Sequence, residues 1–321
     1  RLVIERRLSR LDATTRRTLN AAAILGASFD IDLLETVSAI RGDQLLDCLD
    51  EAERAQIVRP DADGTDARFR FAHPLMRSAI VSALASAQRQ RLHVRAAAAF
   101  EGRADRSPVH DSELARHYRA AGRLADPARA IAALQRAGCT ALDAYANAEA
   151  IGHFEGALKL AERLPGFATT ALADIVHHRG QAQYRLGDWS RSRESLDRAL
   201  ALYAEAGSVP GQAQVLYSKS SLATFDSSPS DALLFLARAR DLMPDDQPLK
   251  ALALQLESQN LVDLRRYADA ARAVDEALAI ADSVDDAYVR NHARIASGYY
   301  ALATLDMPRA VDDFSRVSEA K

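Results

Sequence analysis

The side chains that could do chemistry in this 321-residue sequence include eight histidines, and their spacing limits what they can do. His177 and His178 are adjacent, so on a helix they point to different sides and make poor joint metal ligands. His110 and His117 are two turns apart, and neither has a carboxylate helper at ligand spacing. We therefore interpret these histidines as surface or core residues and predict no metal site.

The sequence also lacks the short motifs that prepare an active site. It has no Gly-x-x-x-x-Gly-Lys-Ser/Thr loop to cradle phosphates, no Gly-x-Ser-x-Gly, no His-Glu-x-x-His and no Cys-x-x-Cys. Cys48 and Cys139 fall in predicted helices of different domains, which favours two buried thiols in a reducing compartment. We therefore predict that this chain is not an enzyme, does not hydrolyse ATP and carries no catalytic residue or cofactor of its own.

Composition limits the partners. The formal charge is 41 − 44 = −3, which gives no overall attraction to nucleic acid or to an anionic membrane. No window holds eighteen apolar residues, and no basic and apolar leader opens the sequence. Hydrophobic residues make up 48% but aromatic residues only 6%, so the core must be built mostly from Ala, Leu, Ile and Val. We expect a cytoplasmic protein of close-packed helices with no membrane partner and no direct nucleic-acid contact.

A small residue recurs through the second half of the chain with spacings of 42, 40, 38 and 40 residues. The series is Gly138, Gly180, Ser220, Ser258 and Gly298. Small residues recur twelve positions later, at Ala150, Ser192, Ala232, Ala270 and Ala310, and larger apolar residues four beyond those, at Phe154, Leu196, Leu236, Val274 and Phe314. The period is typical of a solenoid, in which each helix pair buries its apolar face against the next.

These units resemble the tetratricopeptide repeat. The segment Leu186-Gly187-Asp188-Trp189 matches best, and Arg265 departs from the pattern because it stands where a turn glycine belongs. The resemblance implies about five units over residues 127–321, stacked into a right-handed α-α superhelix. An irregular helical bundle with accidental spacing is the alternative.

The residue pattern of the first part of the chain predicts a domain of another kind. Helices are expected over residues 13–25, 31–40 and 43–55, and two strands over residues 56–59 and 68–71. This order predicts a winged-helix domain over residues 1–85, so that the protein is all-α apart from one β-hairpin, and a helical linker over residues 86–126. Asp61, Asp63 and Asp66 resemble a calcium loop only superficially, because its twelve-residue frame and terminal glutamate are missing.

A winged helix invites a DNA-binding interpretation, which depends on the helix that would enter the major groove. The segment from Asp43 to Arg54 carries five acidic residues and one arginine. It would repel the phosphates that supply most of the affinity of a DNA-binding module. We therefore expect no DNA contact from this domain.

The segment Phe71-Ala72-His73-Pro74-Leu75, followed by Arg77, carries the most specific resemblance. It resembles the nucleotide-sensing histidine motif of STAND-class signalling ATPases and is similar to large ATP-binding LuxR-type, maltose-regulator-like transcription regulators. The resemblance implies that His73 touches the diphosphate of ADP, with Arg77 as a neighbour, once an ATPase core of the same chain supplies ATP or ADP in a longer protein. The alternative is that His73 only caps its helix.

These features favour a regulatory and sensor fragment of a signal-transducing transcription regulator. A small-molecule inducer, or a protein or peptide partner, would bind in the repeat groove. The groove residues are predicted to be polar, aromatic and almost uncharged: His177, Gln181, Tyr184, Tyr217, Ser221, Gln255, Gln259 and Tyr299. A protein-protein interaction scaffold and the regulatory arm of a multidomain enzyme such as a cyclase are the alternatives.

Overall fold

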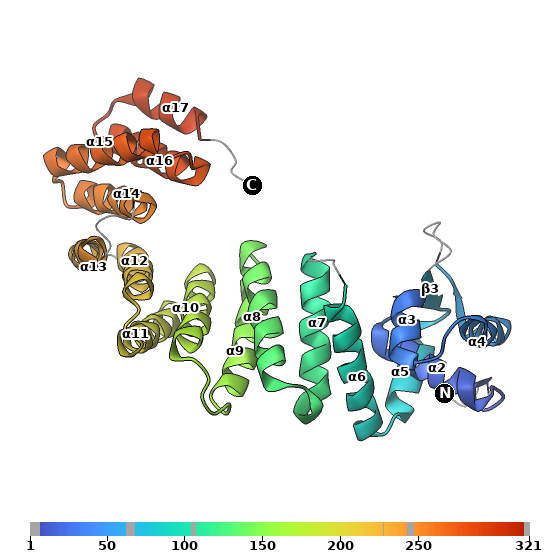
Figure 1. Ribbon diagram of the computed structural model, residues 1–321. Helices are drawn as coiled ribbons and strands as arrows, with labels where there is room; N and C mark the ends of the chain where they lie inside the picture. The colour runs from blue at the N-terminus through green and yellow to red at the C-terminus, as the bar shows by residue number, and fades with distance from the viewer. Residues whose placement is uncertain (1–6, 62–67, 104–106, 227, 243–246, 318–321) are drawn as a thin grey trace. The chain divides into compact units, whose positions relative to one another are not determined.

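The computed structural model describes residues 7–61, 68–103, 107–226, 228–242 and 247–317. The chain divides into two compact units, Arg1–Ala144 with Lys159–Leu164, and Tyr145–Leu158 with Pro165–Lys321. The described residues are mostly helical, with one small sheet near the start (Figure 1). The boundaries drawn from the sequence at residues 85 and 126 stay predictions.

The first unit opens with short helices around the sheet. These elements are α2 (Ala13–Leu25), β1 (Ser28–Asp30), α3 (Ile31–Ser38), α4 (Asp43–Arg54), β2 (Val58–Pro60), β3 (Arg68–Phe71) and α5 (Pro74–Ala83). Local capping explains where two of the helices begin. Asp12 accepts the backbone N–H of Thr15 at 2.9 Å, and Asp30 accepts that of Leu33 at 2.7 Å, so each carboxylate satisfies an amide that the helix itself leaves unpaired.

The sheet has three strands, which corrects the prediction of a single hairpin. Strands β2 and β3 pair antiparallel as expected, and β1 pairs with the other edge of β3. β1 is only three residues long, too short to show an alternating pattern in the sequence. Its position is set by Phe29, which is buried and packs 5.8 Å from Phe71 and 6.5 Å from Phe69 between ring centroids.

The rest of the first unit is a run of longer helices. They are α6 (Ser86–Glu101), α7 (Pro108–Ala121), the 3-10 turn η1 (Gly122–Leu124) and α8 (Pro127–Asp143). Asp126 caps α8 by accepting the N–H of Arg129 at 3.0 Å, with Pro127 at the first helical position as predicted. Leu114 and Tyr118 of α7 pack with alanines of α6 and α8, so these helices share one apolar core.

The described part of the second unit consists of most of α9 followed by successive helix pairs. They are α9 (Asn147–Ala161, of which Leu158 is the last residue in this unit), α10 (Thr169–Arg185), α11 (Trp189–Glu205), α12 (Val209–Phe225), α13 (Pro229–Leu242), α14 (Gln247–Asp263), α15 (Tyr267–Ser283), α16 (Ala287–Ala303) and α17 (Met307–Ser315). In the described part of the chain, no helix combines the length and apolarity needed to cross a bilayer.

The small residues of the repeat lie where helices touch. A Cβ placed on Gly180 would come within 3.1 Å of Leu196 on the next helix, and one on Gly298 would meet the Phe314 ring at 2.8 Å. The Ser192 hydroxyl on α11 stabilises the same contact with α10 by donating a hydrogen bond to the Gly180 carbonyl at 2.9 Å. Close backbone approach therefore explains the period, and the tetratricopeptide-like helical repeat is confirmed.

The turns inside the pairs explain the departure at Arg265. Gly187 has a φ of 83°, a left-handed conformation that glycine adopts without strain. Arg265 and Leu305 adopt φ values of 59° and 65° at the equivalent turns. The turn shape is therefore kept although the glycine is not, at the expense of some backbone strain.

Candidate functional site

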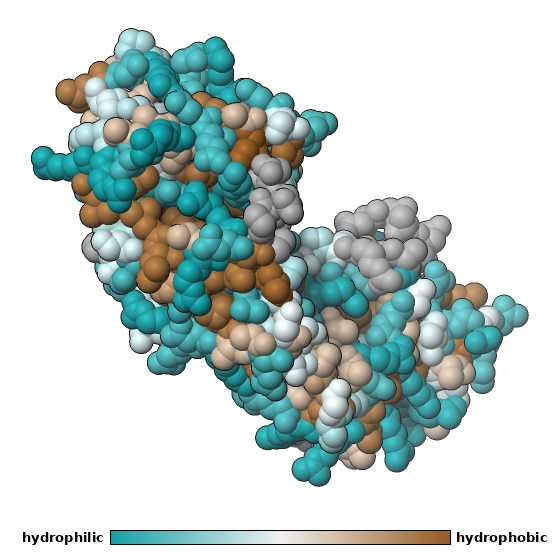
Figure 2. All heavy atoms as spheres, turned by 60° about the vertical axis from the view of Figure 1, so that its left-hand side comes forward, coloured by the Kyte–Doolittle hydropathy of each residue, from teal (hydrophilic) through white to brown (hydrophobic). Residues whose placement is uncertain are grey.

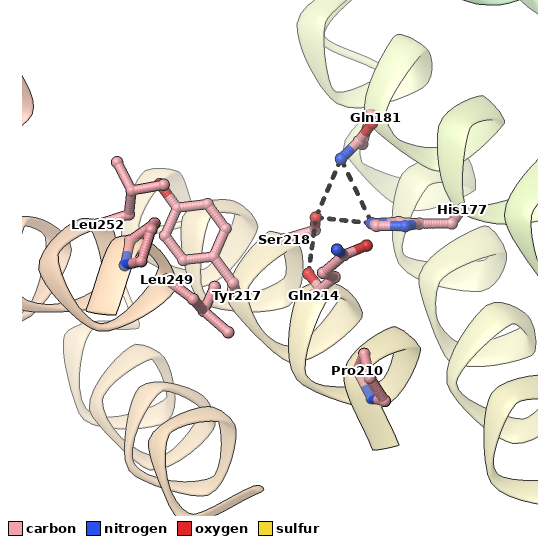
Figure 3. Close-up of a pocket in the computed structure, with 9 residues that line it drawn as sticks. His177, Gln181, Pro210, Gln214, Tyr217, Ser218, Leu249 and Leu252 are labelled. Carbon is pink, nitrogen blue, oxygen red and sulfur yellow. Dashed lines mark hydrogen bonds between the residues drawn. The ribbon is translucent and has the colours of Figure 1, made fainter. Parts of the chain in front are cut away.

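A cavity of about 290 Å³ in the second unit brings together part of the predicted groove (Figure 3). Side chains of α10, α12 and α14, the first helices of three successive pairs, line it. The lining residues are His177, Gln181, Pro210, Gln214, Tyr217, Ser218, Pro248, Leu249 and Leu252.

One half of the cavity is polar. Ser218 Oγ and His177 Nε2 share a hydrogen bond of 2.8 Å, and the Gln181 amide Nε2 reaches both groups, at 3.3 Å from His177 and 3.4 Å from Ser218. The Ser218 hydroxyl also lies 3.2 Å from the Gln214 carbonyl one turn earlier on α12. Contacts between α10 and α12 therefore hold this cluster in place before any ligand arrives.

The other half is apolar. Figure 3 shows Leu249 and Leu252 of α14 on the far side of Tyr217 from the polar cluster. Pro210, in the first turn of α12, adds an apolar contact on the side of Tyr217 where the polar cluster lies. An occupant of this cavity therefore meets hydrogen-bonding groups at one end and aliphatic carbon at the other.

The cavity is electrically neutral. His177 is 4% exposed, and burial, with a smaller contribution from the neighbouring His178, lowers its pKa to about 3. Burial raises the pKa of the Tyr217 phenol well above its usual range, and Tyr288 and Tyr184 add to this effect. No Asp, Glu, Lys or Arg is among the lining residues that the structure describes. At neutral pH the site therefore offers hydrogen bonds and apolar contacts without an ion.

A larger cavity of about 370 Å³ between α13, α14 and α15 has the opposite character. Arg240 lies 2.7 Å from the Glu257 carboxylate, and Arg266 lies 2.6 Å from that of Asp269. Arg272 also pairs with Asp269. These side chains form ion pairs with one another, although the buried Glu257 Oε2 has no hydrogen-bond partner among the described residues. The neutral cavity is the better candidate for an uncharged ligand.

The structure brings three of the eight predicted groove residues into the neutral cavity: His177, Gln181 and Tyr217. The other five do not line it. Tyr184 packs edge-on against Phe225 at 5.6 Å, and the hydroxyl of Ser221 donates to the Tyr217 carbonyl at 3.2 Å. Tyr299 donates to Asp263 at 3.1 Å. Gln255 is 9% exposed and Gln259 partly buried, both on α14.

The sequence interpretation missed the remaining lining residues because it considered only the positions one, three and four residues away from the small residue of each repeat. Gln214 and Ser218 lie one turn apart on the same face of α12, and both precede the small residue Ser220. Pro210 and Pro248 stand 38 residues apart in the first turns of α12 and α14. The repeat spacing of these prolines was the available signal.

The predicted nucleotide sensors have structural contacts of their own. His73 is exposed and caps α5, its Nδ1 accepting the N–H of Leu75 at 3.1 Å. Arg77 donates from Nε to the Ala23 carbonyl at 2.9 Å. The helix-cap alternative therefore describes the contact that His73 makes, and nucleotide sensing stays a prediction.

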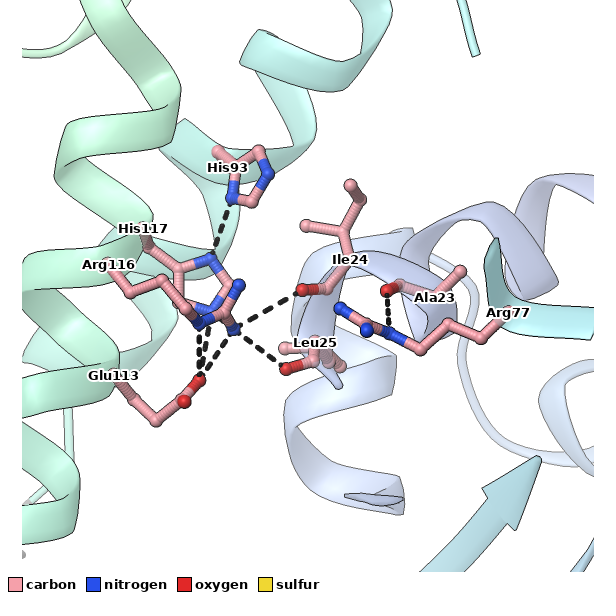
Figure 4. Close-up of polar contacts among 8 residues, drawn as sticks. All are labelled: Ala23, Ile24, Leu25, Arg77, His93, Glu113, Arg116 and His117. Atoms are coloured by element: carbon pink, nitrogen blue, oxygen red, sulfur yellow. Dashed lines mark hydrogen bonds and ion pairs between the residues drawn. The ribbon is translucent and has the colours of Figure 1, made fainter. Parts of the chain in front are cut away.

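A second buried histidine cluster lies in the first unit (Figure 4). His93 and His117 face each other with their Nδ1 atoms 3.0 Å apart. Arg116 Nη2 lies 2.8 Å from His117 Nε2, donates to the Leu25 carbonyl at 3.0 Å and pairs with Glu113 at 2.5 Å. Burial, with smaller contributions from nearby arginines, lowers the pKa of His93 to about 4 and that of His117 to about 2.

Neither cluster has the composition of a metal centre. Across the described ranges, no group of three or more His, Cys, Asp or Glu side chains could hold a metal ion. In the acidic loop, Asp61 accepts a hydrogen bond from Ser28 at 2.7 Å and pairs with Arg70 at 3.6 Å. Asp63 and Asp66 lie outside the described residues.

Comparison with known proteins shows the fold alone. No protein-family model matches the chain, and no curated protein matches it. Among solved structures, BtubC from P. vanneervenii matches 66% of this chain and 88% of its own, with 18% identity and a TM-score of 0.54. Aspartyl phosphate phosphatase F from Bacillus subtilis matches 89% and 68%, with 12% identity and a TM-score of 0.56. The Rap conjugation gene regulator of plasmid pLS20, solved in complex with the Phr* peptide, matches 87% and 74%, with 10% identity and a TM-score of 0.53.

Proposed function

We propose that this chain is a regulatory and sensor region whose repeat array binds an uncharged ligand in the cavity between α10, α12 and α14. The single observation that carries the proposal is the pre-built polar cluster of His177, Gln181 and Ser218 beside an apolar wall. Ligand sites combine a few fixed polar groups with an apolar lining in this way. The fold is compatible with the role, since the pLS20 regulator of similar fold was solved with a peptide bound.

The order of helices and strands in the first unit also supports a role in regulation. The order α2, β1, α3, α4, β2, β3 is the one expected of a winged helix, although α4 carries acidic residues where a DNA reader needs basic ones. Together with the resemblance at residues 71–77, this favours a regulator of the STAND or LuxR type, in which an ATPase core would read the state of the array through His73.

Ligand binding by the array is tested on the purified chain with a double substitution, Gln181→Ala with Gln214→Ala. Thermal unfolding is followed with uncharged small molecules and peptides, because a ligand that binds only the folded state raises the unfolding temperature. A ligand of the cavity should stabilise the wild type and should need at least ten times the concentration to stabilise the double variant. The matched control is Gln212→Ala, the same residue type on α12 but outside the cavity lining. Stabilisation that is equal in all three proteins would reject the cavity as the site.

The role of His73 is tested separately in a complete regulator by two substitutions. Asparagine at position 73 keeps a good N-cap for α5 but removes the imidazole, whereas alanine removes both. Nucleotide sensing predicts that both variants raise the basal output. A role in capping alone predicts that only His73→Ala changes it, through reduced stability.

A further inference from the structure

The cavity of the second unit leaves two carboxamides on neighbouring helices to face an occupant. Gln181 lies on α10 and uses its Nε2 in the polar cluster. Gln214 lies on α12, and its exposed side-chain amide has no hydrogen-bond partner among the described residues. A carboxamide places an acceptor oxygen and an NH₂ donor side by side, the combination that pairs with the C=O and N–H of a peptide backbone.

The opposite wall accepts an aliphatic side chain. Leu249 and Leu252 present branched aliphatic carbon beside the Tyr217 ring, away from the carboxamides (Figure 3). In an extended chain, successive side chains point to opposite sides while the backbone groups stay at the edges. Such a chain can pair its backbone with one wall and direct a side chain to the other.

The neutrality of the lining excludes a charged group at this position. A carboxylate or ammonium brought against His177 and Ser218 would lose hydration and would find no counter-ion among the described lining residues. The residue in the cavity and its immediate neighbours must therefore be uncharged.

Size separates a peptide from a compact small molecule. The cavity volume of about 290 Å³ is at the lower limit of pockets that enclose a whole drug-sized ligand. The lining comes from the first helix of each of three consecutive helix pairs, so the site runs along the repeat array. An elongated occupant, only part of which is enclosed, uses such a site better than a compact one.

We propose that the occupant is an extended peptide that places one aliphatic residue, flanked by uncharged residues, against Tyr217, Leu249 and Leu252. The carboxamide of Gln214 pairs with its backbone C=O and N–H, and Gln181, whose Nε2 stays in the polar cluster, accepts a backbone N–H with its Oε1. This inference rests on the proposed function and selects the peptide over the small neutral molecule.

The test uses the whole 321-residue chain and a displayed library of random peptides. Selected peptides should share one Leu, Ile, Val or Met position with uncharged residues on both sides. A fluorescently labelled selected peptide, followed by anisotropy, should bind at least fivefold more weakly to Gln214→Ala and equally well to Gln212→Ala. Replacing its aliphatic residue by Asp or Lys should weaken binding at least tenfold.

The outcomes separate this inference from the proposed function. Selection of charged sequences, or unchanged binding by Gln214→Ala, would overturn the peptide inference. If no peptide is selected but an uncharged small molecule stabilises the chain in a manner that Gln181 and Gln214 control, the cavity is a ligand site and the peptide inference is false. If no ligand of either class is affected by these substitutions, both proposals fail.

Discussion

The two units each bury a neutral histidine, and among the described residues His177 of the second unit is the one that lines a cavity described above. In the first unit His117 is fully buried, and Arg116 beside it is committed to Glu113 and to the backbone carbonyls at the end of α2 (Figure 4). In the second unit His177 is nearly as buried, yet its polar neighbours Gln181 and Ser218 line open space (Figure 3). A buried imidazole is therefore not by itself a sign of function; what its neighbours face decides between packing and binding.

On the face shown in Figure 2, apolar side chains are exposed among hydrophilic ones. Whether an apolar side chain is buried depends on the helices that surround it, as the function of a buried histidine does. At one repeat position Leu196, Leu236 and Val274 are at most 1% exposed, whereas Phe314 is 40% exposed. Phe154, at the same position of the first unit of the repeat, is 0% exposed. The position is therefore buried in four units and exposed in the fifth, so repeat position does not fix exposure.

The largest expected difference between the units is their response to acid. An unfolded histidine takes up a proton below about pH 6.5, whereas His93 and His117 stay neutral in the fold until about pH 4 and pH 2. The unfolded state then binds more protons, so stability is full above pH 6.5 and falls as the pH drops. Between pH 6.5 and 4.5 we expect His93 and His117 together to cost the first unit roughly 4 kcal/mol, and His177 to cost the second unit roughly 2 kcal/mol.

Amide hydrogen exchange read by mass spectrometry measures this difference, because it reports each helix separately. Amides of α2 and α7 should lose more protection at pH 4.5 than those of α10 and α12. Equal losses would mean that the paired histidines are not held neutral as the structure implies.

The next effect comes from Arg116→Ala. The substitution leaves the Leu25 carbonyl without its donor and Glu113 without its partner, so we expect a loss of about 2 kcal/mol in the unfolding free energy of the first unit. Urea denaturation measures it, with Arg91→Ala, an exposed arginine on α6, as the control expected to change by less than about 0.5 kcal/mol. Ligand binding by the second unit should be unchanged in both variants. A stability loss no larger than that of the control would show that the cluster is not structural.

The smallest effect on stability is expected from Ser218→Ala. The hydroxyl lies at the cavity wall, and His177 keeps Gln181 as a neighbour, so the unfolding free energy should fall by only about 1 kcal/mol. Binding of a cavity ligand should weaken all the same, because the polar wall loses a fixed group. Titration calorimetry with the selected peptide measures this, and an unchanged affinity with a large stability loss would place Ser218 with Arg116 as a packing residue.

The sequence alone determined the repeat architecture and the absence of charge in the predicted groove. Small residues every 38 to 42 positions are a direct record of where backbones approach, as the contacts of Gly180 and Gly298 confirm. The start of α8 at Asp126 and Pro127 was also local information, because a cap and its helix are neighbours in the chain.

Only the tertiary structure decided which polar residues share a site. His177, Gln214 and Ser218 meet because α10 and α12 pack side by side, whereas Gln255, on the next helix of the same kind, is buried away from the cavity. The pairing of His93 with His117 escaped prediction for the same reason, and β1 in addition was too short to show a strand pattern. Each depends on the rotation of one element about its axis when it packs, and a periodic pattern fixes which residues share a face but not what that face meets.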